Sequence, residues 1–183
     1  MTLLNSSCQA AIRLPSLAAY LAERVRCSPT AIALEHGSRR LSYSTLNDRT
    51  NRLANGLADK GLRAGDRVAV VSENCLEYLE LKLAAAKLGV AVACQNWRQA
   101  APELSYCLKL AAPAMVVVSK RFASEVEAIV PGVDLLVIGQ AYEALLSRSS
   151  AHEVDRDPDP ELPFTLLYTS GTTGLPKAAV ISQ

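Results

Sequence analysis

The sequence predicts an α/β protein whose mainly parallel sheet is covered by helices on both faces. Apolar runs rich in β-branched residues alternate along the chain with stretches of helical periodicity. The runs expected to form strands lie at residues 67–72, 90–94, 114–119 and 133–139. None of them alternates cleanly between polar and apolar side chains, as is typical of strands buried on both faces. Strands connected through helices in this way form right-handed βαβ units.

Before the first of these strands the sequence predicts a helix and a short hairpin. The helix starts after Ser16, a suitable N-cap, and ends before Pro29. Its apolar stripe consists of Leu17, Tyr20, Leu21 and Val25. Residues 31–34 and 41–43 are expected to form two short strands joined by a turn at Gly37.

The remaining helices are predicted by their apolar period and by their end signals. A helix over residues 44–61 has Ser44 as its expected N-cap and Gly61 at its exit. Further helices are expected at residues 74–89, 102–111, 120–130 and 141–149. Gly89 suits the end of the first of these, and Pro102 suits the first turn of the next.

Residues 149–162 interrupt the alternation of strands and helices. This stretch is rich in acidic residues and proline and has no apolar period, so we expect a solvated surface linker. A cation site in the acidic cluster is the weaker alternative. The expected organisation is therefore an α/β subdomain over residues 1–148, the linker over 149–162, and a strand with a loop over 163–183 that begins the next subdomain.

Composition and charge exclude several classes of function. Half of the 183 residues are hydrophobic, and the formal net charge is +1. Nothing in this balance favours nucleic acid or an anionic membrane as a partner. The apolar runs are too short to span a membrane, and the N-terminus lacks the basic start and continuous apolar run of a signal peptide. We expect a cytoplasmic protein.

The cysteines indicate reduced thiols rather than disulfides or a metal site. The sequence has five cysteines, an odd number, and no CxxC motif, and only two histidines could complete a metal site. This pattern is typical of unpaired thiols in a reducing compartment. We expect them to be mostly buried, and we expect no metal ligands in this chain.

The stretch YTSGTTGLPK, residues 168–177, carries the strongest functional signal. Glycine permits a tight turn in which backbone N–H groups converge on phosphate oxygens. Hydroxyl groups add donors, and a lysine adds positive charge. The expected phosphate contacts are Thr169, Ser170, Gly171, Thr172, Thr173, Gly174 and Lys177. The alternative is a polar turn that joins two strands.

This stretch is neither of the two common glycine-rich nucleotide motifs. The P-loop pattern requires a glycine five residues after the first one and a Ser or Thr after the lysine. Here Pro176 stands five residues after Gly171, and Ala178 follows Lys177. The dinucleotide pattern GxGxxG is not matched either. A nucleotide site at this position must therefore be of another kind.

The order of residues closely resembles the phosphate-loop signature of the adenylate-forming enzymes, which include acyl-CoA and aryl-CoA synthetases, luciferase and peptide-synthetase adenylation domains. The likeness extends upstream through residues 41–74 and 87–108, and so covers the chain from about residue 15. The end of the chain, PKAAVISQ, resembles the aryl-acid ligases such as 4-chlorobenzoate:CoA ligase. One departure is Ala93-Cys94, near which the family often has a proline.

The resemblance implies a fold, an activity and a set of ligands. The fold is the N-terminal part of the large domain of these enzymes. The activity is the MgATP-dependent conversion of a carboxylic acid to an acyl-adenylate, followed by transfer to coenzyme A. ATP and Mg²⁺ are the implied cofactors, CoA is the co-substrate, and the residues from Thr169 to Gly174 together with Lys177 contact the phosphates.

Because the chain stops at Gln183, most of the family's site is expected outside it. The adenine, acid and CoA sites and the catalytic lysine of these enzymes lie downstream, so no catalytic residue is expected here. We expect the N-terminal piece of an acid:CoA ligase, inactive alone, whose partners are the C-terminal remainder and a second copy in a homo-oligomer. A binding or interaction module without catalysis, or half of a split adenylating enzyme, is the alternative.

Overall fold

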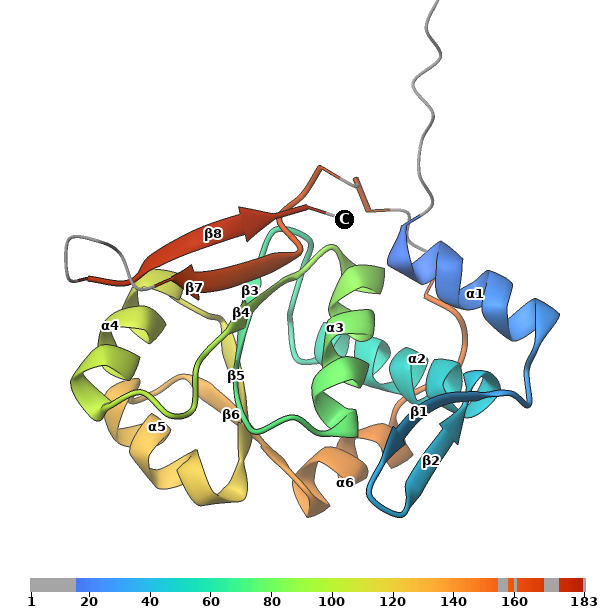
Figure 1. The fold of residues 1–183 in the computed structure, drawn as a ribbon, viewed down its shortest axis with the longest axis horizontal. Coiled ribbons are helices and arrows are strands. Elements are labelled where there is room, and N and C mark those ends of the chain that lie inside the picture. Colours follow the sequence, from blue (N-terminus) through green and yellow to red (C-terminus); the bar gives the residue numbers. More distant parts are fainter. Residues whose placement is uncertain (1–15, 155–157, 160, 170–174, 183) are drawn as a thin grey trace, which may run out of the picture.

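The computed structural model describes residues 16–154, 158–159, 161–169 and 175–182. Their main sheet contains the strands β3 (Arg67–Val71), β4 (Ala91–Cys94), β5 (Met115–Ser119), β6 (Asp134–Ile138), β7 (Thr165–Thr169) and β8 (Lys177–Ile181). Within the described residues the order of the strands is β6-β5-β3-β4-β7-β8 (Figure 1). All neighbouring pairs are parallel except β7 and β8. The predicted α/β fold with a mainly parallel sheet is confirmed.

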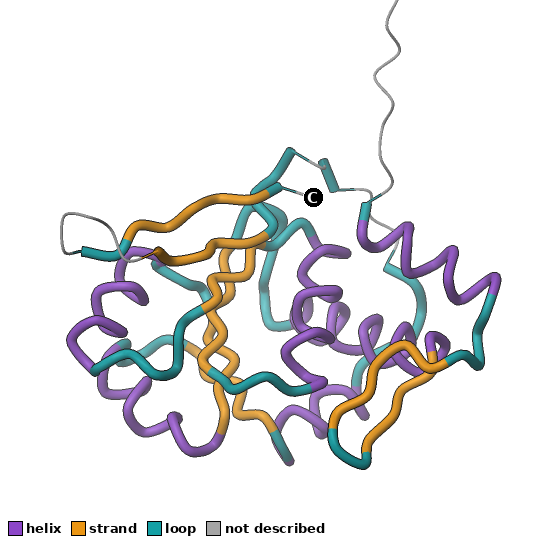
Figure 2. Tube along the Cα trace, viewed as in Figure 1, coloured by secondary structure: helices purple, strands orange, loops and turns teal. Residues whose placement is uncertain are grey.

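Helices cover both faces of this sheet. They are α1 (Leu17–Cys27), α2 (Tyr43–Asp59), α3 (Leu76–Leu88), α4 (Ala101–Ala111), α5 (Ala123–Ile129) and α6 (Gln140–Arg148), with a 3₁₀ turn η1 at Lys120–Phe122. Figure 1 shows α4 and α5 on one side of the sheet and α2, α3 and α6 on the other. In Figure 2 the orange strands run between these two groups of purple helices. The chain therefore forms three layers, as βαβ units require.

The central strand shows why the predicted strands lack alternation. Val68 and Val70 of β3 pack against α2, α3 and α6, whereas Ala69 and Val71 pack against α4 and α5. All four side chains are completely buried. Because each face meets a layer of helices, both sets of alternating positions must be apolar. Each buried valine contributes about 1.5–3 kcal/mol to folding.

The small N-terminal hairpin was predicted correctly, but the helix before it is less buried than expected. β1 (Ile32–His36) pairs antiparallel with β2 (Arg39–Ser42), and Gly37 in the turn has φ +60°. Ser16 caps α1 as predicted, accepting a hydrogen bond from the Ala19 N–H at 3.2 Å. Of the expected apolar stripe, however, Leu17 is 39% and Tyr20 is 60% exposed, and Leu21 is buried.

The predicted cap of α2 is wrong by two residues. Ser42, with extended backbone angles, accepts a hydrogen bond from the Thr45 N–H at 3.2 Å, and Ser44 lies inside the first turn. Ser42 ends β2, so the same residue leaves the strand and opens the helix. The predicted glycine at the end of α3 is confirmed, since Gly89 adopts a left-handed conformation there.

Residues 149–153, after α6, lie at the surface as predicted, with Ser150, His152 and Glu153 exposed, but their backbone is bonded to α2. Side chains of α2 hold their backbone carbonyls: Arg52 donates to Ser149 at 2.9 Å, and Asn55 donates to Ser150 and His152 at 2.9 and 3.0 Å. Ser149 itself is only 6% exposed. The segment therefore packs along α2 before the chain reaches β7. The subdomain boundaries at residues 148 and 162 stay a prediction.

The described cysteines are unpaired, but they are not mostly buried as expected. Cys27 is exposed, Cys75 and Cys94 are half-buried, and Cys107 is buried. Within the described ranges, no three His, Cys, Asp or Glu side chains come together in a way that could hold a metal ion. The search of the same residues for a helix with the length and apolar character to cross a membrane found none.

Candidate functional site

The candidate phosphate-binding residues flank the connection between β7 and β8. Thr169 is the last residue of β7 and Lys177 the first of β8, and they are directly opposite each other in the antiparallel pair. Opposite residues of such a pair share a face of the sheet, with Cβ atoms about 4.5–5.5 Å apart. The structure therefore brings these two residues together on one face of the hairpin, and both are exposed. Ser170, Gly171, Thr172, Thr173 and Gly174 lie outside the described residues.

This hairpin lies at the edge of the sheet where ligands of α/β proteins bind. β7 runs parallel to β4, with Cys94 opposite Leu167, so the carboxyl ends of both strands meet at one edge. In open α/β sheets, ligands bind in the crevice outside the carboxyl ends of the strands. The phosphate-binding prediction and the topology thus indicate the same edge.

A polar pocket of about 350 Å³ lies beside Thr169. It is formed by the turn after β4, the start of α4 and the two ends of the hairpin loop. Its lining residues are Cys94, Asn96, Arg98, Gln99, Glu103, Tyr168, Thr169 and Pro176. The guanidinium of Arg98 stacks on the Trp97 ring, 4.0 Å from its centroid. The pocket thus offers amide and hydroxyl donors, one cation and one carboxylate to a polar ligand.

Tyr168, which the sequence argument did not single out, connects this pocket to the protein core. Its hydroxyl donates to the Cys107 carbonyl at 3.2 Å and accepts a hydrogen bond from Gln95 Nε2, also at 3.2 Å. Burial raises the pKa of the Tyr168 phenol, so it remains a donor at neutral pH. These partners are 61 and 73 residues away in the sequence, which is why no local pattern indicated the contact.

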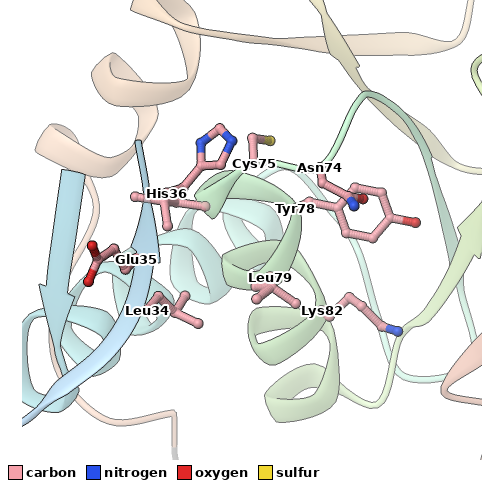
Figure 3. Close-up of a pocket in the computed structure, with 9 residues that line it drawn as sticks. Leu34, Glu35, His36, Asn74, Cys75, Tyr78, Leu79 and Lys82 are labelled. Atoms are coloured by element: carbon pink, nitrogen blue, oxygen red, sulfur yellow. The ribbon is translucent and has the colours of Figure 1, made fainter. Parts of the chain in front are cut away.

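A second hollow lies between β1 and α3, away from the hairpin. Its volume is about 340 Å³, and its lining comes from Leu34, Glu35 and His36 of β1 and from residues 74–82 at and after the start of α3. In Figure 3 Leu34 and His36 lie on the side of β1 that faces α3, whereas the carboxylate of Glu35 points away from it. A neighbouring apolar hollow of about 310 Å³ shares Leu34, Leu79 and Lys82 and is bounded by Phe164. Burial raises the pKa of both the Cys75 thiol and the Tyr78 phenol, so neither group is an activated nucleophile. The polar pocket beside Thr169 is therefore the better candidate site.

Comparison with known families and curated proteins identifies relatives of this chain. Residues 21–183 match the family model described as AMP-binding enzyme. A feruloyl-CoA synthase of Amycolatopsis sp is 35% identical over 180 residues, covering 94% of this chain and 34% of the relative. An indoleacetate–CoA ligase of Aromatoleum aromaticum is 34% identical, covering 91% of this chain and 35% of the relative. The chain thus spans about a third of the length of these relatives.

Solved structures share the fold. The N-terminal domain of FACL13 from Mycobacterium tuberculosis superposes with a TM-score of 0.84 at 29% identity, covering 92% of this chain and 44% of that chain. ATP-bound MatB from Rhodopseudomonas palustris superposes with a TM-score of 0.82 at 30% identity, covering 91% and 34%. An anthranilate CoA ligase at 21% identity, with a TM-score of 0.86, supports the fold alone.

Proposed function

The chain belongs to the AMP-binding enzyme family, and from this premise we propose that it is the N-terminal part of an AMP-forming carboxylic acid:CoA ligase. The observation that carries the proposal is the position of YTSGTTGLPK. This loop sequence connects β7 to β8 at the carboxyl edge of a parallel sheet, with Thr169 opposite Lys177. Relatives named as CoA ligases or synthases support the reaction class.

In the proposed reaction the acid's carboxylate attacks the α-phosphorus of ATP, and pyrophosphate leaves. Negative charge builds on the leaving pyrophosphate, and fixed donors around it lower the barrier. We assign that role to Thr169, Ser170, Gly171, Thr172, Thr173, Gly174 and Lys177. The thiol of CoA then attacks the acyl carbonyl carbon, a thioester forms, and AMP leaves with the electrons of the broken acyl–phosphate bond. Mg²⁺ supplies further charge neutralisation when it is bound with ATP; we assign it no ligand in this chain, whose described residues form no metal-binding group.

We propose an aryl acid as the substrate class. The sequence PKAAVISQ resembles 4-chlorobenzoate:CoA ligase, and two of the relatives are named for feruloyl and indoleacetate groups. A long-chain-fatty-acid–CoA ligase of Mycobacterium tuberculosis is also 35% identical, and acyl acids are the alternative. By the family resemblance, we expect the acid pocket outside this chain.

ATP titration of the purified 183-residue chain tests the phosphate site. We expect Lys177→Ala to weaken binding about ten- to hundredfold, because a hydrogen bond to a charged group contributes about 1.5–3 kcal/mol. Lys109→Ala, on the exposed end of α4, is the matched control. Equal ATP affinity of all three proteins would refute the assignment of Lys177.

Activity is expected only when the remainder of the enzyme is present. The measurement is acid-dependent exchange of pyrophosphate into ATP, with aryl and acyl acids compared. We expect no exchange by the isolated chain and exchange by a longer protein that includes it. Exchange by the chain alone would show that it holds a complete adenylation site.

A non-catalytic interaction module is the second candidate, and the exposed edge of the sheet favours it. On β8, Val180 is 60% and Ile181 is 44% exposed, and Leu167 of β7 is 41% exposed. Apolar edge strands pair readily with other chains. Sedimentation of the wild-type chain and of Val180→Lys distinguishes the candidates: an association that the substitution abolishes supports the module, and a wild-type monomer that binds ATP contradicts it.

A further inference from the structure

We propose that Tyr168 is a positioning residue for Thr169 at the end of β7, acting through its hydrogen bonds to Gln95 and Cys107. The identity of the ligand in this inference rests on the proposed function. The anchoring itself rests on the described geometry of β7, so the positioning role can fail while the proposed function stands.

The pairing between β7 and β4 ends at Leu167, before Tyr168 and Thr169. Its pairs are Val92 with Thr165, Ala93 with Leu166, and Cys94 with Leu167. Tyr168 and Thr169 continue the strand beyond these pairs and pair with β8 alone. β8 is itself an edge strand with exposed apolar side chains, so it gives Thr169 little support from the core.

The Tyr168 side chain supplies the missing connection. Successive residues of a strand point to opposite faces, so Tyr168 points to the same face as Leu166, which packs in the cluster with α4. There its hydroxyl joins the carbonyl of Cys107 in α4 to the side chain of Gln95, which follows β4 and is only 4% exposed. Thr169 and Lys177 point to the other face. One phenol thus links the end of β7 to α4 and to the turn after β4.

The consequence is that the hydroxyl of Tyr168 sets where Thr169 lies. Both hydrogen bonds of the phenol are made to protein groups, so we expect its hydroxyl to act on phosphate binding through the backbone that joins Tyr168 to Thr169. Tyr168→Phe keeps the ring in place and removes both hydrogen bonds. Gln95→Met keeps a similar volume at the partner and removes one. Tyr20→Phe, on a side chain that is 60% exposed, is the matched control.

Two probes measure the effect on the purified chain: ATP and inorganic tripolyphosphate, which lacks the nucleoside. We expect Tyr168→Phe to weaken both by about three- to tenfold, the usual effect of losing hydrogen bonds of this kind. Gln95→Met should weaken both by a smaller factor in the same direction. Tyr20→Phe should change neither. A loss confined to ATP would overturn the proposal, because the phenol would then act on the nucleoside.

Two further readouts separate positioning from a general loss of stability. Hydrogen exchange of the amides of Tyr168, Thr169 and Ala178, which belong to β7 and β8, should accelerate in Tyr168→Phe, while the amides of β3 and β5 keep their protection. In wild-type chain labelled with ¹³C at the tyrosine Cζ atoms, the signal that Tyr168→Phe removes should shift when tripolyphosphate is added. A signal that stays unmoved at saturation overturns the coupling.

The two proposals are distinguished by their failures. If the wild-type chain binds neither ATP nor tripolyphosphate, the phosphate-binding function is overturned, together with the positioning role that rests on it. If it binds both, and Tyr168→Phe binds them equally with unchanged hydrogen exchange, the positioning role is overturned and the phosphate site stands.

Discussion

The ammonium group of Lys87 and the carboxylate of Glu153 form an ion pair between the last turn of α3 and the segment that leaves α6. The lysine is only 2% exposed, although it carries a charge. Asn47 accepts a hydrogen bond from the same ammonium at 3.0 Å, and both Asn47 and Asn51 donate to Glu153 at 3.1 Å. The ion pair therefore fastens the segment after α6 to α2 and α3.

Glu153→Gln should destabilise the chain by about 1–3 kcal/mol. The substitution leaves the buried ammonium of Lys87 without a counter-charge, which is costly for a group removed from water. The Glu153 side chain is 53% exposed, and this keeps the expected loss below that of a fully buried pair. Urea unfolding measures the change, with Glu127→Gln on the exposed face of α5 as the control. Equal losses in the two variants would contradict the prediction.

The same ion pair should make stability depend on acid pH. Burial acts to raise the pKa of the Glu153 carboxyl, but hydrogen bonds from Lys87, Asn47 and Asn51 outweigh it and hold this pKa below its ordinary value of 4.5. The stabilisation is therefore present above the unfolded pKa and is lost as pH falls through the lower folded pKa. The stability difference between wild type and Glu153→Gln should shrink below about pH 4. A difference that stays constant from pH 7 to pH 3 would refute this linkage.

Glu80→Gln should cost about 2–4 kcal/mol. The Glu80 carboxylate has no exposed surface, and it accepts hydrogen bonds from Arg49 Nε at 2.6 Å and from the Tyr142 hydroxyl at 2.8 Å. Neutralising it weakens both contacts and leaves Arg49 under-compensated. Glu143 is the other carboxylate partner of Arg49, and the Glu143 side chain is 48% exposed. Glu143→Gln should therefore cost less than about 1 kcal/mol. Calorimetry of both variants checks that the buried partner dominates.

Gly56→Ala should destabilise α2, although alanine is the better helix former by about 1 kcal/mol. A Cβ at this position would lie 2.6 Å from Ser149 Oγ and 2.9 Å from two Leu145 carbons. Overpacking of this kind costs about 1–3 kcal/mol. The thermal unfolding temperature should therefore fall, and Ser149→Ala in the same chain should restore part of it. An unfolding temperature above that of wild type would contradict the prediction and would show that α6 can shift away from α2 at little cost.

Ser42→Ala should destabilise the chain by about 1 kcal/mol, and Ser44→Ala should change it much less. Ser42 satisfies an otherwise free N–H at the start of α2, whereas Ser44 lies within the helix. Urea titration of the two variants in parallel measures the difference. A larger loss of stability in Ser44→Ala than in Ser42→Ala would contradict the prediction and would indicate Ser44 as the cap.

The strands and the glycine turns could be predicted because their causes are local. Val68 and Val70 belong to a short apolar, β-branched run that is typical of a buried strand, and Gly37 allows a tight turn. The cap was missed because Ser42 and Ser44 both satisfy the same local rule. The choice between them depends on how β1 and β2 pair, which is tertiary information.

The candidate site divides in the same way. The content of YTSGTTGLPK predicts phosphate contacts, which stay a prediction, and two of those residues, Thr169 and Lys177, lie opposite each other across the hairpin. The role of Tyr168 could not be predicted, because Gln95 and Cys107 approach it only after β4, α4 and β7 are packed together.

The neighbours of β7 in the sheet also have a consequence for the order of folding. β6 ends one edge of the described sheet, yet β7 pairs with β4, so the chain crosses to the other side of the sheet before the hairpin forms. Strand pairs whose residues are far apart in the sequence form slowly, because the chain between them must lose conformational entropy before the strand contacts form. The β3–β5 and β5–β6 pairs close shorter stretches. The hairpin is therefore expected to dock late, onto strands that have already paired.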